Sequence, residues 1–237
     1  MVKLLVSVRN AVEAAQAIDG GADWIDAKEP AAGALGMPEP RELAGVVAQV
    51  AGRRPVSTAL GELGDHGYGD RLRQLPWQGV SWAKVGLSGC GLHLDWPAKI
   101  QTLRDELPEQ TSLVAVVYAD HTTCDAPSPE EVLRVACDLG LRALLVDTYD
   151  KTSGGLFDWF SPERLRELFA AAHCAGMLTV AAGSLRAAEV PQAIAVGAEV
   201  IAVRGAACQQ QRRDAPVCAK QVAQLRDRIP ATNAEFS

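Results

Sequence analysis

Eight short runs of apolar and β-branched residues recur along the chain, and each precedes a longer segment rich in Ala, Leu, Glu and Arg with helical periodicity. This alternation is typical of repeated βα units that build a parallel sheet. The expected strands are residues 3–8, 23–28, 55–60, 81–86, 112–118, 141–147, 177–182 and 199–203. The expected helices are residues 10–20, 39–51, 68–76, 95–106, 128–139, 161–175, 186–196 and 214–228.

Four junctions between a helix and the next strand contain a glycine, at Gly21, Gly140, Gly176 and Gly197. A glycine there ends the helix and lets the chain turn back toward the sheet. Eight βα units in about 230 residues match the usual size of a closed barrel. We therefore predict an α/β fold of the (β/α)8 TIM-barrel type rather than a doubly wound open sheet. It should form a single domain over residues 1–229, followed by a flexible C-terminal tail at 230–237.

The overall charge argues against a nucleic-acid partner. The net charge is −6 and the isoelectric point is near 5.3, so a general surface for polyanions is not expected. A local basic pocket for a small phosphate is still compatible with this charge.

The six cysteines include no C-x-x-C pair, and no cluster of Cys and His has the spacing of a zinc site. We expect reduced thiols and no bound metal. The N-terminal segment is too short and too soon charged for a signal sequence, and no apolar stretch approaches the roughly 18 residues that cross a bilayer. We therefore predict a cytoplasmic protein without membrane contact, with a homo-oligomer as the default assembly.

Two lysines end short apolar runs, Lys28 in the second expected strand and Lys84 in the fourth. An ammonium must be solvated or paired, so this placement suggests an amine held for chemistry. In a (β/α)8 barrel, the strand C-termini and the loops after them build the active site. Two neighbouring ammonium groups repel each other, and a lowered pKa would suit one amine for attack on a carbonyl. One lysine would then form an iminium while the other moves protons.

Three aspartates accompany these lysines at expected strand ends. Asp26 shares its strand parity with Lys28, so both side chains should point the same way, and Asp26 could hold the ammonium, relay a proton, or only fix the barrel through a salt bridge. Asp147 and Asp120 each follow an apolar run and could be a general acid or base, a helix cap, or a partner to a lysine. Lys151, in the loop after Asp147, could reach a phosphate or stay solvated.

The last two βα turns have the composition of a phosphate site. Gly183 and Ser184 follow the seventh expected strand, and Arg204, Gly205 and Ala206 follow the eighth. Glycine lets a ligand approach the backbone, serine adds a hydroxyl, and arginine can pair with an anion. Many barrels bind phosphate with backbone N–H groups in these two turns.

A series of short motifs resembles the (5-formylfuran-3-yl)methyl phosphate synthase family, which provides the furan of methanofuran-type cofactors. The resemblance extends in order over nearly the whole chain. The motifs are Lys28-Glu29-Pro30-Ala31-Ala32-Gly33-Ala34-Leu35-Gly36, Lys84-Val85-Gly86-Leu87, Tyr118-Ala119-Asp120, Leu145-Val146-Asp147-Thr148, Leu156-Phe157-Asp158, Ala182-Gly183-Ser184 and Val203-Arg204-Gly205-Ala206-Ala207-Cys208.

The resemblance implies a barrel enzyme that needs no cofactor and condenses two glyceraldehyde 3-phosphate molecules into a furan phosphate. It also implies that Lys28 is the Schiff-base lysine, Lys84 the proton-transferring lysine and Asp147 an acidic residue that assists them. The chain departs from the family at residues 209–214, where a Gly-rich stretch leading into Asp-Arg would be expected, and in the loop 121–126.

Two other functions stay open from the residues alone. Another Schiff-base aldolase acting on phosphorylated aldehydes would have the same fold and the same paired lysines. A non-catalytic barrel that binds a phosphorylated metabolite for a partner enzyme would not need the two lysines.

Overall fold

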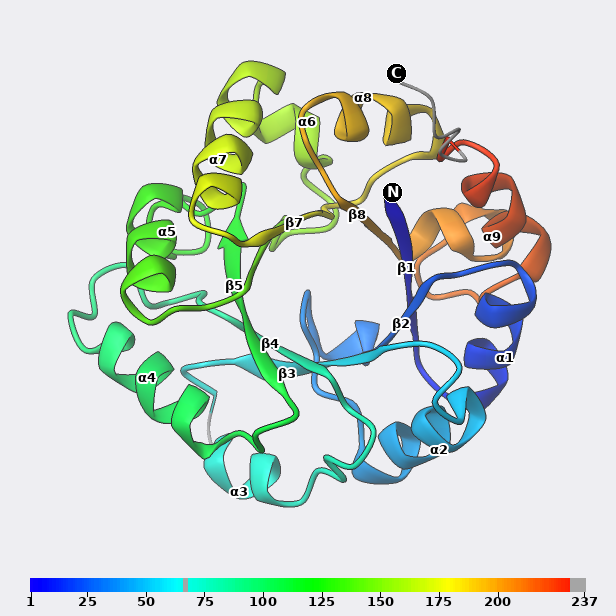
Figure 1. Cartoon of the computed structure of the whole chain (residues 1–237), viewed down its shortest axis with the longest axis horizontal. Helices are drawn as coiled ribbons and strands as arrows, with labels where there is room; N and C mark the ends of the chain where they lie inside the picture. The colour runs from blue at the N-terminus through cyan, green and yellow to red at the C-terminus, as the bar shows by residue number, and fades with distance from the viewer. Residues whose placement is uncertain (66–67, 231–237) are drawn as a thin grey trace, which may run out of the picture.

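The computed structural model describes residues 1–65 and 68–230, in which eight parallel strands close into a barrel (Figure 1). Each strand pairs with the next in the sequence, and β1 also pairs with β8. The strands are β1 (Lys3–Val8), β2 (Trp24–Ala27), β3 (Val56–Glu62), β4 (Trp82–Gly86), β5 (Ser112–Tyr118), β6 (Ala143–Asp147), β7 (Leu178–Ala181) and β8 (Val200–Val203). The predicted (β/α)8 barrel is confirmed.

Helices surround this barrel on its outside (Figure 1). The α-helices are α1 (Ala11–Asp19), α2 (Pro40–Val50), α3 (Tyr68–Arg73), α4 (Trp96–Glu106), α5 (Pro129–Asp138), α6 (Leu156–Trp159), α7 (Pro162–Cys174), α8 (Val190–Ala195) and α9 (Ala219–Arg226). Short 3₁₀ helices are η1 (Pro30–Ala32), η2 (Ala187–Glu189), η3 (Gly205–Ala207) and η4 (Gln209–Gln211). Over the described ranges, none of these helices is both long and apolar enough to cross a membrane.

The helix predictions were wrong in detail in the second half of the chain. The helix expected over 186–196 is divided into η2 and α8, because Pro191 has no N–H to continue a helix from the preceding turn. The helix expected over 214–228 begins only at Ala219, after η4 and an isolated β-bridge between Cys208 and Val217. Helix α6 was missed because four residues are too few to show periodicity. The predicted flexible tail lies, from residue 231 onward, outside the described residues.

The apolar side chains form two buried clusters on opposite faces of the sheet. The larger cluster lies between the strands and the helices, and the smaller one fills the barrel interior with residues such as Leu145 and Val180. Near the N-terminal ends of β2 and β4, Trp24 and Trp82 stack with ring centroids 5.8 Å apart. The two tryptophans fill the interior near the N-terminal ends of the strands, and the polar side chains further along the same strands lie toward the C-terminal ends.

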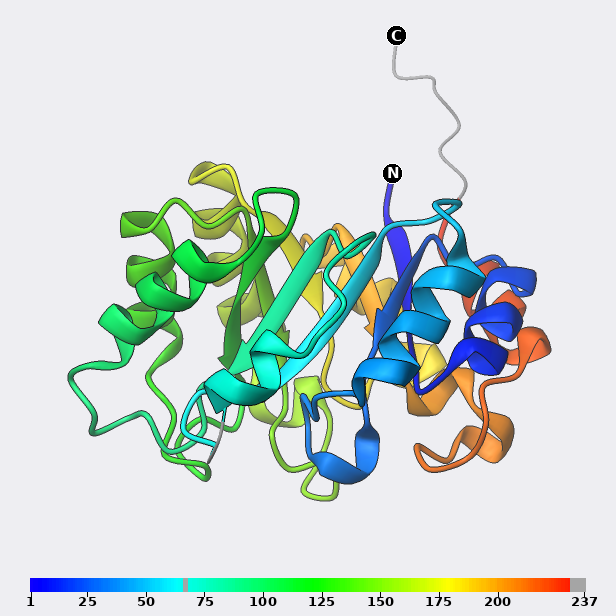
Figure 2. The same ribbon diagram turned by 90° about the horizontal axis from the view of Figure 1, so that it is seen from below.

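The loops that follow the strands gather at one end of the barrel. Figure 2 shows the connections after β2, β6 and β8 extending from the lower edge, at the C-terminal ends of the strands. The register places Ser7 of β1 and Ser57 of β3 beside Asp26 of β2. These three polar residues therefore form a row across the inner face of the sheet, close to the C-terminal ends of the strands.

The contact between α1 and α9 provides a test of the packing. A Cβ at Gly20 would lie 2.4 Å from the Cβ of Val222 and 2.6 Å from the carbonyl oxygen of Ala219. We expect Gly20→Ala to lower the free energy of unfolding by about 1–3 kcal/mol through overpacking. The matched control is Gly45→Ala in α2, where the nearest atom would be 3.7 Å away and helix propensity should add about 0.5–1 kcal/mol. Urea denaturation measures both; equal effects would contradict the packing.

Candidate active site

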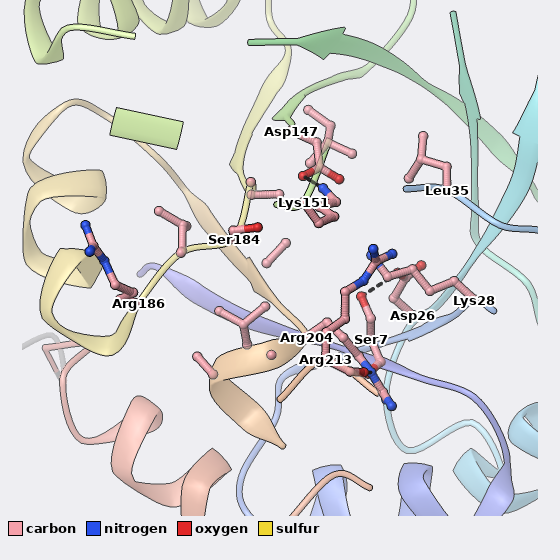
Figure 3. Close-up of a pocket in the computed structure, with 18 of the residues that line it drawn as sticks. Ser7, Asp26, Lys28, Leu35, Asp147, Lys151, Ser184, Arg186, Arg204 and Arg213 are labelled. Carbon is pink, nitrogen blue, oxygen red and sulfur yellow. Dashed lines mark hydrogen bonds and ion pairs between the residues drawn. The ribbon is translucent and has the colours of Figure 1, made fainter. Parts of the chain in front are cut away.

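A pocket of about 330 Å³ opens at the C-terminal ends of the strands. Figure 3 shows Asp147 and Lys151 on one side of it, and Ser7, Asp26, Arg204 and Arg213 on the other. Of the residues predicted from the sequence, those that line the pocket are Asp26, Lys28, Lys84, Asp147, Lys151, Gly183, Ser184, Arg204, Gly205 and Ala206. Asp26 and Lys28 share the pocket, in keeping with their strand parity.

Asp26 is fully buried and has one partner on each of β1, β3 and β4. It accepts hydrogen bonds from the hydroxyls of Ser7 (2.8 Å) and Ser57 (2.7 Å). Its Oδ1 atom also lies 2.6 Å from the Nζ atom of Lys84, which is equally shielded from solvent. Such hydrogen bonds help to offset the cost of burying both charges. The carboxylate is therefore committed to Lys84 rather than to Lys28.

Asp147 makes a second buried ion pair, with Lys151 from the following loop. Its Oδ1 atom also accepts a hydrogen bond from the backbone N–H of Thr148, at 2.8 Å. Burial would raise the pKa of Asp147, but the ammonium groups of Lys151 and Lys28 and these hydrogen bonds hold it below its ordinary value. Asp147 is thus held as a carboxylate.

Lys28 is only 7% exposed and has no carboxylate within 4 Å in the described part of the chain. Its Nζ atom lies 3.4 Å from the carbonyl oxygen of Ala34, in the loop after β2. Burial lowers the pKa of Lys28 to about 7, opposed by the charges of Asp147 and Asp26. Lys151 and Lys84 contribute smaller lowering effects. The repulsion inferred from the sequence therefore acts, but desolvation is the larger cause.

The charges in this cluster balance only when Lys28 is neutral. Asp26 and Asp147 supply two negative charges, and Lys84 and Lys151 balance them as direct partners. A third ammonium would be an uncompensated charge in a poorly solvated pocket. The arrangement therefore favours a free amine on Lys28 near neutral pH, which is the form that attacks a carbonyl carbon.

Asp120 is not among the residues that line the pocket. It is fully buried, and its two carboxylate oxygens accept hydrogen bonds from the backbone N–H groups of Tyr149 (2.7 Å) and Asp150 (2.8 Å). These bonds hold the loop that carries Lys151. The structure thus places Asp120 behind the site, where it supports a loop rather than facing a ligand.

The loops after β7 and β8 contribute backbone atoms to one end of the pocket. Gly183 and Ser184 after β7 have positive φ angles of 90° and 51°. Gly205 and Ala206 after β8 begin the 3₁₀ helix η3. This end of the pocket can present backbone N–H groups and a hydroxyl to an anion, as the sequence suggested.

Arg204 lines the pocket, but its guanidinium is occupied by protein acceptors. Both Nη atoms bind the buried carboxylate of Glu13, and the remaining bonds go to three backbone carbonyls. Arginine has five N–H donors in total, and all five are used. The expected direct contact from Arg204 to a phosphate would require breaking one of these bonds.

Arg213 is a charged pocket residue that the sequence motifs did not indicate, and Ser7 is a polar one. Arg213 is half-buried, lines the pocket, and donates through Nη2 to the carbonyl oxygen of Gly33 at 2.7 Å. Among the described residues it has no carboxylate within ion-pair distance, whereas Arg186 nearby is paired with Glu189. The sequence signal for Arg213 is a pair of arginines, Arg212 and Arg213, which follow η4 in the connection between β8 and α9.

A metal ion has no evident binding place in this arrangement. Residues 1–65 and 68–230 contain no group of three or more His, Cys, Asp or Glu side chains suited to hold one. The two carboxylates that line the pocket, Asp26 and Asp147, are instead paired with lysines.

Comparison with known proteins identifies the family. Residues 4–226 match the family model of 4-HFC-P synthase. The (5-formylfuran-3-yl)methyl phosphate synthase of Methanococcus maripaludis is 34% identical over 217 residues, covering 90% of this chain and 92% of the relative. The enzyme of the same name from Methanopyrus kandleri is 33% identical over 217 residues, with the same coverage. The chain belongs to the 4-HFC-P synthase family.

This membership confirms the resemblance inferred from the motifs and the prediction of an enzyme of this family. Among solved structures, a 3-hexulose-6-phosphate synthase superposes with a TM-score of 0.62 over 97% of this chain and 100% of that one. At 17% sequence identity, this likeness shows the shared barrel fold alone.

The buried amine should weaken the fold of this 4-HFC-P synthase family member below neutral pH. A lysine whose pKa is lowered to about 7 on folding binds its proton less tightly in the folded state. The resulting penalty is complete below pH 7 and disappears as the pH rises toward the ordinary lysine pKa of about 10.4. We expect Lys28→Met to be more stable than wild type by on the order of 1–3 kcal/mol at pH 6, and by less at pH 9.

Urea denaturation at both pH values measures this difference. The exposed Lys220→Met in α9 is the matched control and should show no such change between the two pH values. If Lys28→Met raises the free energy of unfolding by the same amount at both pH values, Lys28 is not a neutral amine in the folded protein.

Proposed function

We propose that this enzyme condenses two glyceraldehyde 3-phosphate molecules into (5-formylfuran-3-yl)methyl phosphate through a Schiff base on Lys28. The observation that carries the proposal is the buried Lys28 amine with a pKa near 7, beside two buried ion pairs. The family membership supports the product, since the relatives from methanogens carry that name. The product would provide the furan of a methanofuran-type C1 carrier.

The chemistry begins with the free amine of Lys28 attacking the aldehyde carbon of one triose phosphate. Loss of water from the carbinolamine gives an iminium, which acidifies the adjacent C–H bond. The enamine formed by proton removal attacks the aldehyde carbon of the second triose. Ring closure and eliminations then give the aromatic furan and return the lysine. Two C3 monophosphates, less one phosphate and two waters, account for all atoms of the C6 monophosphate.

Lys84 and Asp26 form the proton-transfer pair in this proposal. Ser7 and Ser57 hold the carboxylate of Asp26, so the ammonium of Lys84 has a fixed position in the pocket. A proton can move between Lys84 and the reacting carbon while Asp26 balances the charge. Asp147 and Lys151 form the corresponding pair on the other side of the pocket (Figure 3).

The phosphate of the substrate would bind at the end formed by the β7 and β8 loops. Gly183, Ser184, Gly205 and Ala206 supply backbone N–H groups and a hydroxyl there. Arg213 and Lys151 add positive charge to the same pocket. No direct phosphate contact is assigned to Arg204, whose donors are all engaged.

Borohydride reduction in the presence of glyceraldehyde 3-phosphate, followed by peptide mass mapping, tests the nucleophile. We expect an adduct on Lys28 in wild type and none in Lys28→Arg, because a guanidinium keeps the charge but is not a nucleophile. Turnover should fall by at least about 10³-fold in Lys28→Arg, in proportion to the loss of covalent catalysis. An adduct on another lysine would contradict the assignment of Lys28 as the nucleophile.

Lys84→Arg separates imine formation from proton transfer. The variant keeps a cation beside Asp26, so it should still form the Lys28 adduct while turnover falls by roughly 10²-fold or more. Full activity in Lys84→Arg would remove Lys84 from the mechanism. Mass analysis of the product distinguishes a furan phosphate from the product of another Schiff-base aldolase.

A further inference from the structure

We propose that Arg204 is a positioning residue that fixes the β8 loop and thereby places Arg213 against the substrate phosphate. The proposal rests on the proposed function, in which this end of the pocket receives that phosphate. It assigns different roles to two neighbouring arginines: Arg213 contacts the ligand, and Arg204 acts only through Arg213.

Arg204 contacts the backbone of Arg213 and of the chain directly after it. Its Nε atom donates to the carbonyl oxygen of Arg213 at 3.1 Å, and Nη2 donates to that of Ala215 at 3.1 Å. Nη1 donates to the carbonyl oxygen of Ser7 on β1 at 3.0 Å. One side chain therefore ties the loop after β8 to the first strand of the barrel.

A buried carboxylate holds the guanidinium in this orientation. Glu13 at the start of α1 pairs with both Nη atoms of Arg204, and both side chains are 4% exposed. Arg9 binds the same carboxylate from the outer side through its side chain and its backbone N–H. Burial would raise the pKa of Glu13, but these hydrogen bonds hold it below its ordinary value. If Arg204 left this pair to reach a phosphate, the buried carboxylate of Glu13 would lose one of its two arginine partners, which costs free energy.

The β8 loop has a conformation that needs external support. Gln210 and Gln211 have φ angles of 54° and 57°, in the left-handed region that non-glycine residues rarely occupy. Two consecutive residues of this kind lie just before Arg213. The hydrogen bonds from Arg204 to the carbonyls of Arg213 and Ala215 stabilise the backbone immediately after this unfavourable segment.

Arg213 is left with donors for a ligand. Its guanidinium donates one hydrogen bond, from Nη2 to the carbonyl oxygen of Gly33, to the described part of the protein. Its other N–H groups are available to a ligand in the pocket that Arg213 lines. Because Glu13 neutralises Arg204, the two arginines can lie close together at limited electrostatic cost. The pairing of Arg204 thus keeps Arg213 as the anion-binding member of the two.

The test compares two aldehydes that differ only in the phosphate. The rate of borohydride-trapped adduct formation on Lys28 is measured with glyceraldehyde 3-phosphate and with glyceraldehyde, and their ratio is the phosphate preference. We expect Arg213→Lys to lower this ratio about tenfold, because a lysine cannot reproduce the fork of N–H groups. Arg204→Lys should lower it to a similar extent, since it keeps the charge beside Glu13 but loses the bonds to the loop.

The double variant Arg204→Lys/Arg213→Lys decides between the two roles. If Arg204 acts through Arg213, the phosphate preference of the double variant is no lower than that of Arg213→Lys alone. A further tenfold loss in the double variant would show an independent contact and overturn the proposal. An unchanged ratio in Arg204→Lys, with equal losses for both aldehydes, would show a merely structural role and also overturn it. Arg212→Lys, beside Arg213 and exposed, is the matched control and should leave the ratio unchanged.

If Arg204→Lys does not fold, Glu13→Gln serves instead, because it releases Arg204 from its carboxylate. The proposal predicts a phosphate preference that is unchanged or lower in Glu13→Gln. A higher preference would mean that Arg204, once free, binds the phosphate directly, which contradicts the proposal.

Failure of the proposed function is distinguishable from failure of this inference. If wild type forms no adduct with either aldehyde, the Schiff-base proposal fails. The same variants are then compared by calorimetric binding of inorganic phosphate, for which the same non-additive pattern is expected. Additive losses of phosphate affinity would overturn the positioning role on their own.

Discussion

The site depends on a mismatch between buried positive and negative charges. Two aspartates at the barrel mouth, Asp26 and Asp147, each hold a lysine from another segment, while a third lysine shares the pocket without a carboxylate of its own. Because burial disfavours an unpaired ammonium, the proton is most easily lost from Lys28. Both carboxylates are already paired, so neither is free to stabilise an ammonium on Lys28 by direct contact.

The barrel supplies this arrangement through register and alternation. Ser7, Asp26 and Ser57 are aligned across β1, β2 and β3, so the carboxylate that holds Lys84 is oriented from both sides. The stacked tryptophans fill the interior near the N-terminal ends of the strands, whereas these polar residues lie near the C-terminal ends. On the far side, Asp120 holds the backbone of the loop that carries Lys151. The Asp26–Lys84 pair is thus held by strands, and the Asp147–Lys151 pair depends on a loop that Asp120 stabilises.

The sequence predicted the barrel fold and the location of Lys28 and Lys84 at the C-terminal end of the strands, because both depend on local patterns. Strand periodicity and the parity of Asp26 with Lys28 are short-range properties that can be read along the chain. The sequence could not show that Asp26 pairs with Lys84, because that contact depends on how side chains of β2 and β4 meet over β3 inside the barrel. The role of Arg204 was obscured in the same way, since Glu13 lies 191 positions away. Arg213 was overlooked because the loop conformation that turns it inward has no periodic signal.

The central claim is that Lys28 is a neutral amine near physiological pH, and its own titration tests that claim most directly. The carbon-13 chemical shift of Cε in labelled lysine reports protonation of the amine, and the Lys28 signal is assigned by its disappearance in Lys28→Arg. The structure predicts a titration midpoint near pH 7 for this signal. A midpoint close to the ordinary lysine value of about 10.4 would contradict the account.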